Sequence, residues 1–429
     1  MRHAPIPTSL FVENRARRAR RLLPNSIAFV NSNDIFPTNA DGTLRLVPNS
    51  DLFYLTGVQQ EESILVLYPD AEDPKHREML FLRETSELIS IWEGHKLTKD
   101  EARKLTGIDR VHWLSEFPGI YRRLMCEADQ IYLNSNEHKR AQCEVETRES
   151  RFVKQVQNEY PLHQYHRLAR ELHQLRSVKS DIEVRLIREA CDLTHRGFER
   201  VARFVRPGVN EMEVEAEFLH EFARAGGSFA YTPIIASGAN ACVLHYIEND
   251  RPCADGDLLL LDVAAQRACY QSDLTRTIPV NGRFTPRQRK VYDAVLRVLR
   301  GCIDGLAPGR RIRDWQKQAE DLVERECVDL GLLTLQQIRD QDPEKPAYKE
   351  FFMHGVGHPI GLDVHDVGLT TEPMQEGWVM TVEPAIYLRK EGFAVRLEND
   401  IVVRAGGNVD LMADIPLDAD AVEALMAQR

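Results

Sequence analysis

Short apolar runs separated by polar, helix-like segments organise the first part of the chain. Residues 136–176 are polar, charged and helical in composition, and we expect them to bridge two domains. The remaining pattern indicates an α/β domain over residues 1–176, which ends in this helical linker. The runs that predict strands are short and rich in large apolar residues, and they are residues 26–30, 63–68 and 79–83.

The pattern changes after residue 176. Ser180 and Glu183 stand three residues apart before an apolar-periodic run, which is typical of a capping box at a helix start. We expect this helix to reach about Phe204, because Pro207 and Gly208 would end it. A second domain is predicted over residues 177–429. Its other predicted elements are helices at 211–224, 285–305 and 313–330 and strands at 257–263, 378–387 and 393–403.

Acidic residues interrupt the apolar strands of the second domain. Asp262 closes the run LLLL, Asp273 opens DLTRTIPV, Glu383 lies inside VMTVEPAIYL, and Glu398 lies inside FAVRLENDIVV. A carboxylate in a strand core is costly unless it is paired or binds a metal. Each acid taken singly has a simpler explanation. Glu398 could pair with the nearby arginine, and Asp273 could cap a turn. Four acids in one domain favour a shared cation.

Two hairpins would bring these acids together. A turn-like segment, AAQRACYQS, separates Asp262 from Asp273, and a second turn around residues 390–392 separates Glu383 from Glu398. Antiparallel strands on each side of the two turns would place the carboxylates side by side. Hard oxygen ligands favour Mg²⁺, Mn²⁺ or similar ions. Four carboxylates carry a charge of −4, which two divalent ions would balance.

A glycine-rich segment, HGVGHPIGLDVHDVG, adds three histidines, His354, His358 and His365. Its glycines allow the backbone to pass close to a bound group. One neutral imidazole among the ligands suits Mn²⁺, Co²⁺ or Zn²⁺ better than Mg²⁺ or Ca²⁺. The other histidines could donate hydrogen bonds to a substrate carbonyl or a tetrahedral intermediate. His245 in ACVLHYIEND could do the same, although a lone histidine is also a common structural residue.

Composition and charge limit the class of protein. The 429 residues carry a net charge of −11, which argues against a nucleic-acid partner because such a protein needs a basic face. Eight cysteines occur without a C-x-x-C pair, as expected of scattered reduced thiols. We expect no membrane partner, because no apolar run reaches the roughly 20 residues of a membrane span.

The start of the chain carries an arginine-rich stretch at residues 15–21 but no apolar core of a signal peptide. Such a stretch could mimic an organelle transit peptide. The alternative is a solvated first helix with an apolar stripe, and we favour it. The expected location is therefore the cytoplasm.

The second domain resembles a known metallopeptidase family. The segments ASGANACVLHY, LLLLDVAAQRACYQSDLTRTIPVNGRFT, HGVGHPIGLDVHDVG, TVEPAIY and VRLENDIVV are similar to those of the pita-bread fold shared by aminopeptidase P, prolidase and methionine aminopeptidase. In the first domain, PNSDLFYLTG and IWEGHKL resemble the N-terminal domain of aminopeptidase P. The resemblance implies an α/β domain followed by a pita-bread catalytic domain. It also implies metal-dependent hydrolysis of the N-terminal Xaa-Pro bond of peptides that have proline in second position.

The resemblance implies a dinuclear site, with Mn²⁺ as the expected metal and Co²⁺ or Zn²⁺ as alternatives. One ion would be held by Asp273, His358, Glu383 and Glu398, and the other by Asp262, Asp273 and Glu398. A water between two metals has a lowered pKa and is a nucleophile near neutral pH. Glu383 would pass a proton to the departing proline nitrogen. By resemblance, the catalytic residues are His365, Glu383 and Arg396, and the substrate-binding residues are His245, His354, His365 and Tyr387.

The resemblance leaves some questions open. Ala264 and Ala385 stand where glycine is usual in the family, Arg267 where an aromatic is common, and Asn399 where an aspartate commonly follows the last ligand. These departures could alter hydrogen bonds around the ligands. A prolidase shares all five ligands and is the nearest alternative, and a non-catalytic or creatinase-like relative would lack them. Family members form homodimers or homotetramers, in which Trp92 could reach a neighbouring active site unless it is an ordinary packed tryptophan.

Overall fold

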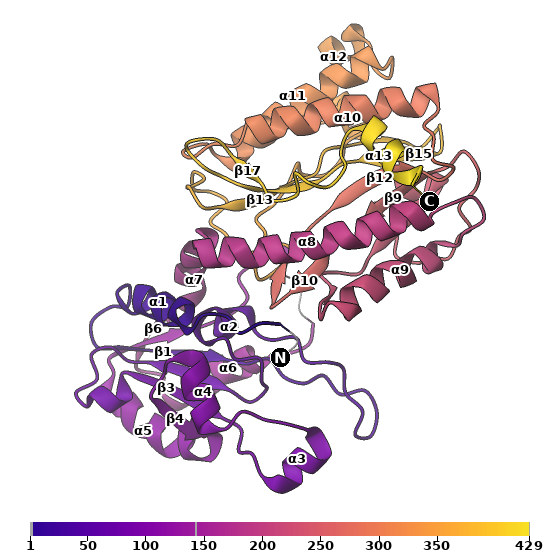
Figure 1. Ribbon diagram of the computed structural model, residues 1–429. Helices are drawn as coiled ribbons and strands as arrows, with labels where there is room; N and C mark the ends of the chain where they lie inside the picture. The colour runs from indigo at the N-terminus through magenta and orange to yellow at the C-terminus, as the bar shows by residue number, and fades with distance from the viewer. Residues whose placement is uncertain (1–2, 142–143, 429) are drawn as a thin grey trace. The chain divides into compact units, whose positions relative to one another are not determined.

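The computed structural model describes residues 3–141 and 144–428. Two compact units make up the chain, the N-terminal unit Ala4–Arg176 and the C-terminal unit that begins at Ser177 (Figure 1). Met1, Arg2 and Arg429, which belong to the predicted domains, and Cys143 lie outside the described residues. The described cysteines are all free thiols. Within the described residues, none of the helices combines the length and hydropathy that crossing a bilayer requires.

The N-terminal unit is built on a mixed sheet in the order β4-β3-β2-β1-β5-β6. Its strands are β1 Ser26–Asn31, β2 Ile64–Leu67, β3 Glu78–Leu82, β4 Arg110–Trp113, β5 Gln130–Leu133 and β6 Gln164–Arg167. Its helices are α1 Thr8–Ala19, α2 Ser50–Thr56, α3 Glu87–Glu93, α4 Lys99–Thr106, α5 Phe117–Glu127, α6 Arg148–Glu159 and α7 Leu168–Ser177, with short 3₁₀ turns η1 Pro74–His76 and η2 Leu114–Glu116. The three strands predicted from apolar runs, now β1, β2 and β3, are confirmed.

Two expectations for this unit were wrong. Residues 136–176 contain more than a helical bridge, because β6 pairs in parallel with β5 and completes one edge of the sheet. The first helix forms as predicted, but Arg15 and Arg18 are buried rather than solvated. Arg15 donates to the carbonyl of Leu55, and the Arg18 guanidinium lies 5.0 Å from the centre of the Tyr132 ring. Long side chains at helical spacing therefore face the interior here, although composition alone suggests a solvent-facing helix.

The C-terminal unit places strands between two pairs of helices. Long helices α8 Asp181–Phe204 and α9 Glu211–Arg224 cover one face, and α10 Pro286–Asp304 and α11 Ile312–Asp329 lie on the other (Figure 1). The predicted capping box is confirmed, since the Ser180 and Glu183 side chains each bond the other's backbone N–H at the start of α8. The predicted helices at 285–305 and 313–330 correspond to α10 and α11.

Short strands of the C-terminal unit carry the site. They are β7 Ser228–Phe229, β8 Ile234–Ser237, β9 Leu258–Asp262, β10 Ala265–Arg267, β11 Tyr270–Gln271, β12 Thr275–Pro279, β13 Val379–Val382, β14 Ala385–Leu388, β15 Phe393–Arg396, β16 Asn399–Val402 and β17 Val409–Asp410. The remaining elements are η3 Gly238–Cys242, α12 Leu335–Asp340, η4 Ala347–Glu350 and α13 Ala419–Met426. The apolar residues of β9 and β13–β16 share one core with those of α10 and α11.

The strands predicted at 378–387 and 393–403 are each interrupted once. The first divides into β13 and β14 at Glu383 and Pro384, and the second into β15 and β16 at Leu397 and Glu398. Proline has no N–H to donate to a ladder, so regular pairing stops there. β14 then pairs antiparallel with β15, and β13 pairs antiparallel with β16. The two acidic residues therefore lie at facing breaks between the two ladders.

Candidate metal centre

Each carboxylate lies where a strand ladder ends. Asp262 is the last residue of β9, and Asp273 precedes β12 by two residues. β9 and β12 pair antiparallel with Asp262 opposite Thr275, as the predicted first hairpin requires. Glu398 lies beside the same strands, because its N–H donates to the Thr275 carbonyl at 3.0 Å. The sheet therefore gathers acids that are up to 136 residues apart in the sequence.

The glycine-rich segment fixes His358 against β13. The Thr381 N–H donates to the His358 carbonyl at 2.8 Å, and the His358 N–H donates to Thr381 Oγ1 at 3.1 Å. A Cβ on Gly357 would lie 2.0 Å from the Thr381 carbonyl oxygen, so only glycine permits this approach. The glycine that the sequence places before His358 is thus required for packing at this point.

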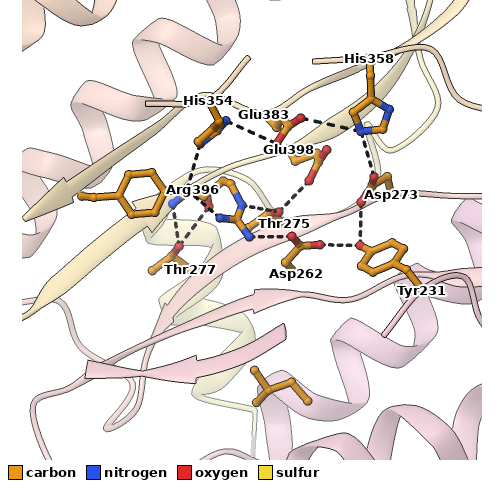
Figure 2. Close-up of polar contacts among 12 residues, drawn as sticks. Tyr231, Asp262, Asp273, Thr275, Thr277, His354, His358, Glu383, Arg396 and Glu398 are labelled. Atoms are coloured by element: carbon orange, nitrogen blue, oxygen red, sulfur yellow. Dashed lines mark hydrogen bonds and ion pairs between the residues drawn. The ribbon is translucent and has the colours of Figure 1, made fainter. Parts of the chain in front are cut away.

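Asp273, His358 and Glu398 offer ligand atoms that all lie within 4.8 Å of one another. His358 Nε2 lies 3.5 Å from Asp273 Oδ2 and 3.8 Å from Glu383 Oε1. Figure 2 shows these side chains converging, with Asp262 connected to Asp273 through Tyr231. The structure therefore brings all five predicted ligands into one polar cluster.

Tyr231 is a site residue that the sequence did not reveal. Its hydroxyl lies 2.6 Å from Asp262 Oδ1 and 2.6 Å from Asp273 Oδ1, and it holds the two carboxylates in register. The residue belongs to an irregular segment before β8, in FAYTPIIAS. A single tyrosine in a loop has no periodicity or spacing that would have identified it.

Arg396 balances part of the negative charge. Its Nη2 lies 2.6 Å from Asp262 Oδ2, and its Nε donates to Thr275 Oγ1 at 3.1 Å. Thr275 Oγ1 in turn donates to Glu398 Oε2 at 2.7 Å. Thr277 Oγ1 holds the backbone of Arg396 from both sides. Arg396, predicted as a catalytic residue, therefore contacts Asp262 directly and Glu398 through Thr275.

Burial shifts the protonation of these groups. It raises the pKa of Glu383 to about 7, and it raises the pKa of Asp262 despite the opposing charge of Arg396. The pKa of Glu398 rises well above its ordinary value, first through burial and then through repulsion from Asp273. Burial alone would lower the pKa of His358, but Asp273 and Glu383 raise it to about 9. The protein groups alone leave an excess of negative charge that favours proton or cation uptake.

The donor set fits divalent metal ions. Glu398 Oε1 is buried and has no hydrogen-bond partner within the described part of the chain. A buried oxygen of this kind is costly unless a cation binds to it. His358 Nδ1 donates to the Pro359 carbonyl at 3.0 Å, so Nε2 is the ring nitrogen that faces Asp273 and would bind a metal ion in place of its proton. A backbone acceptor on the second ring nitrogen is a common support for a metal-ligating histidine.

The predicted substrate-binding residues occupy the rim of the cluster. His354 Nδ1 lies 3.8 Å from Glu383 Oε2, and its Nε2 lies 2.9 Å from the Tyr387 hydroxyl, which also accepts from Arg396 Nη1 at 2.7 Å. Burial lowers the pKa of His354 to about 4. The exposed His365 ring packs edge-on against His358, with ring centres 4.2 Å apart. The structure therefore groups His354, His365 and Tyr387 with the ligands.

His245 is less closely tied to the cluster. Its side chain is exposed on the segment after η3. Its charge is among the influences that lower the pKa of His354, after burial and the charge of Arg396, so the two imidazoles lie within electrostatic range. The structure shows no direct contact between His245 and the predicted ligands.

The departures from the family pattern are accommodated locally. Asn399 Oδ1 accepts from the buried Arg276 at 2.7 Å, and its Nδ2 donates to Asp410 Oδ2 at 2.6 Å. Arg267 donates to the Ala225 carbonyl at 2.5 Å, and Ala264 and Ala385 are buried. The adjacent Asp400, which the sequence analysis did not single out, accepts from the Asp273 N–H at 3.0 Å.

Each of the two units matches a known protein family. Residues 185–405 match the model of metallopeptidase family M24, and residues 11–132 match the aminopeptidase P N-terminal domain. The Xaa-Pro aminopeptidase of Haemophilus influenzae is 33% identical over 99% of this chain and 98% of its own length.

Solved structures give the same correspondence along the whole chain. The structure of the Pseudomonas aeruginosa aminopeptidase PepP has a TM-score of 0.90 at 32% identity and covers 99% of both chains. The zinc-substituted Escherichia coli aminopeptidase P in complex with product has a TM-score of 0.88 at 31% identity, again over 99% of both chains. The arrangement of the two units along the sequence is therefore shared with these enzymes from one end to the other.

Proposed function

Because this chain belongs to metallopeptidase family M24, we propose that it is a metal-dependent Xaa-Pro aminopeptidase. It hydrolyses the N-terminal Xaa-Pro bond and releases the first residue of peptides that have proline in second position. The fold is an α/β domain followed by a pita-bread catalytic domain. One observation carries the proposal. The five ligand-type side chains converge in a chain that is 33% identical to a Xaa-Pro aminopeptidase over nearly its whole length.

The residues that would hold divalent metal ions are Asp262, Asp273, His358, Glu383 and Glu398. When bound, such ions polarise a peptide carbonyl and make a water nucleophilic near neutral pH. We propose Mn²⁺ as the native ion, because four carboxylates and one imidazole form a mostly hard donor set that still contains nitrogen. Co²⁺ and Zn²⁺ are the alternatives.

The side chains at the rim would bind and orient the peptide. Glu383, whose Oε2 lies 3.8 Å from His354 Nδ1 at the rim, would accept a proton from water and return it to the proline nitrogen. His354 and Tyr387 form one hydrogen-bonded pair at 2.9 Å beside Glu383, and they would contact the proline side of the substrate. His365 and His245 would donate hydrogen bonds to the carbonyl oxygen as negative charge develops there.

We also propose that the protein is a cytoplasmic homodimer or homotetramer. The support for self-association is an exposed apolar cluster on α3, where Trp92 is 80% exposed, Ile91 73% and Leu88 65%. In the described chain Trp92 is therefore not an ordinary packed tryptophan. A contiguous exposed apolar surface of this kind is typical of an interaction site.

The decisive assay compares a tripeptide Xaa-Pro-Yaa with a dipeptide Xaa-Pro on purified protein loaded with Mn²⁺. Release of Xaa from the tripeptide, abolished by a chelator and restored by added metal, is the expected result. Cleavage of the dipeptide alone would make the enzyme a prolidase. Cleavage of neither substrate by protein with measured bound metal would overturn the proposal.

Two variants and one control connect the activity to the cluster. Asp273→Ala and Glu398→Ala should abolish both activity and metal content measured by elemental analysis. Asp100→Ala is the control, because Asp100 is an 81% exposed acid on α4 that should affect neither. Full activity in Glu398→Ala would show that the carboxylate with the unpaired buried oxygen is not a ligand.

A further inference from the structure

Residues 237–251, here called the His245 segment, carry the predicted substrate histidine on a stretch that forms no helix or strand after η3. The middle of this segment is exposed, since Val243 and Ile247 are each 54% exposed. A stretch with few buried apolar contacts is easily displaced unless hydrogen bonds hold it. The bonds that hold its two ends therefore decide where the His245 imidazole lies.

Glu211 joins the two ends of the His245 segment. It is the first residue of α9 and is completely buried. Its Oε1 accepts from the N–H and from the hydroxyl of Ser237, each at 2.7 Å. Its Oε2 accepts from the Tyr246 hydroxyl at 2.7 Å and from the Arg251 N–H at 3.0 Å. One carboxylate thus binds the first residue of the segment, the residue after His245 and the last residue.

The surroundings of Glu211 require a carboxylate. Burying a charge is costly unless hydrogen bonds compensate it, and five neutral donors do so here, including the Asn240 amide at 3.4 Å from Oε1. Each carboxylate oxygen faces a backbone N–H, which can donate but cannot accept. A glutamine would point its NH₂ group at one of these N–H groups in either orientation. Only a side chain with two acceptor oxygens can therefore hold both ends of the segment.

The His245 segment adjoins the candidate metal centre. η3 packs against β15, and the Cys242 Sγ lies 3.4 Å from the Phe393 carbonyl of that strand. β15 ends at Arg396 of the cluster. The charge of His245 also contributes to the lowered pKa of His354, after burial and the charge of Arg396. A displacement of the segment would therefore move the His245 imidazole relative to the site.

We propose that Glu211 is a positioning residue that holds the His245 imidazole where it can donate to the substrate carbonyl. This inference rests on the proposed function, in which His245 acts on the negative charge that develops on that oxygen. Interactions that strengthen only in the transition state raise kcat rather than lower KM. Loss of the Glu211 carboxylate should therefore lower kcat, while KM and metal content stay close to those of the native enzyme.

The test is a double-mutant cycle on the full-length, Mn²⁺-loaded enzyme with Ala-Pro-Leu as substrate. His245→Ala should lower kcat by about tenfold or more, because it removes one donor to the developing charge. Glu211→Gln should lower kcat by about tenfold in the native background, but by less than about twofold in the His245→Ala background, where the residue that it positions is absent. Equal fold losses in the two backgrounds would overturn the inference, because a merely structural carboxylate acts independently of His245.

A milder variant keeps the test decisive if Glu211→Gln does not fold. Ser237→Ala combined with Tyr246→Phe removes one hydroxyl donor from each carboxylate oxygen and leaves both backbone donors in place. It should lower kcat by about threefold in the native background and have no further effect in the His245→Ala background. An unchanged kcat in the native background would contradict the inference.

Glu221→Gln is the matched control. Glu221 is an acid of the same helix with a side chain that is only 6% exposed, and its carboxylate pairs with Arg224 at 3.1 Å. The substitution should leave kcat unchanged in both backgrounds.

Hydrogen exchange gives a readout that does not need activity. Followed by mass spectrometry, residues 237–251 should exchange faster in Glu211→Gln than in the native enzyme or in Glu221→Gln. Unchanged exchange would overturn the inference even if kcat falls. If the native enzyme cleaves no Xaa-Pro peptide, the proposed function fails, and the exchange measurement alone decides whether Glu211 holds the His245 segment.

Discussion

The guanidinium of Arg396 lies 2.6 Å from Oδ2 of Asp262, and the two side chains are only 4% and 16% exposed. The partners are 134 residues apart in the sequence. Arg396 also donates to the Tyr387 hydroxyl and to Thr275 Oγ1. One buried cation therefore connects a metal-ligand carboxylate, the substrate rim and the threonine that supports Glu398.

We predict that Arg396→Met destabilises the metal-free protein by about 3–5 kcal/mol, because it leaves Asp262 buried without a counter-charge. Arg396→Lys should retain part of the stability and lose activity, since one ammonium cannot serve three partners in different directions. Urea unfolding of the chelated protein and the peptide assay check the two effects.

The control for this prediction is Arg300→Met. Arg300 forms an ion pair with Asp418 on the surface, where the side chains are 54% and 60% exposed, so its loss should cost at most about 1 kcal/mol. Equal stability of the two methionine variants would show that Arg396 does not neutralise a buried acid.

Tyr231→Phe should weaken Mn²⁺ binding by about 10- to 100-fold while the protein stays folded. The hydroxyl holds Asp262 and Asp273 at 2.6 Å each, and its removal frees both carboxylates to rotate. Metal titration followed by thermal unfolding measures the change. Tyr165→Phe, which removes a hydroxyl bonded to backbone carbonyls in the N-terminal unit, should leave metal affinity unchanged. Native-like affinity in Tyr231→Phe would contradict the role of this tyrosine.

A buried ion pair connects the start of the C-terminal unit to the loop of His365. Lys179 Nζ lies 2.9 Å from Asp366 Oδ2, with the side chains 2% and 1% exposed. Lys179→Met should cost about 3–5 kcal/mol, because it removes the cation that faces the buried Asp366 carboxylate. The double variant Lys179→Met, Asp366→Leu should recover most of that stability, since apolar pairs often replace buried ion pairs without loss.

The same variants separate stability from positioning. Asp366 follows His365 directly. The double variant should therefore have a higher Tm than Lys179→Met but a lower kcat than the native enzyme, because its His365 imidazole is displaced. Full kcat in the stable double variant would show that the ion pair does not position His365.

We predict that the stability of the N-terminal unit depends on pH through the buried Glu149. Burial raises the pKa of this carboxyl to about 7, although hydrogen bonds from Asn31 oppose the rise. Between pH 4.5 and 7 the folded state then holds a proton that the unfolded state has released. The free energy of unfolding should therefore fall as pH rises through this window, by up to about 3 kcal/mol. Urea unfolding at a series of pH values measures this loss.

Glu149→Gln should remove that pH dependence and stabilise the unit at pH 8. The carboxylate now accepts from the N–H and Nδ2 of Asn31, and Asn31 Oδ1 is buried with no hydrogen-bond partner among the described residues. After rotation of the Asn31 amide, that oxygen can accept from a glutamine at position 149. A variant that retains the native pH profile would assign the effect to another group.

Local sequence signals predicted the elements that depend on near neighbours. The strand β2 and the helix α8 form where an apolar run and a capping box predicted them, because strand burial and helix capping are decided within a few residues. The order of acids and histidines predicted a cation site for a similar reason. Carboxylates inside apolar strands need a partner wherever the strands pack.

Tertiary structure alone decided which atoms meet. The Tyr231 hydroxyl between two aspartates and the burial of Arg15 and Arg18 depend on contacts across tens or hundreds of residues. The pairing of Arg396 with Asp262 and of Lys179 with Asp366 does so too. No periodicity encodes these contacts, since each is selected by the electrostatic cost of burying a charge, and that cost exists only after the chain has folded around it.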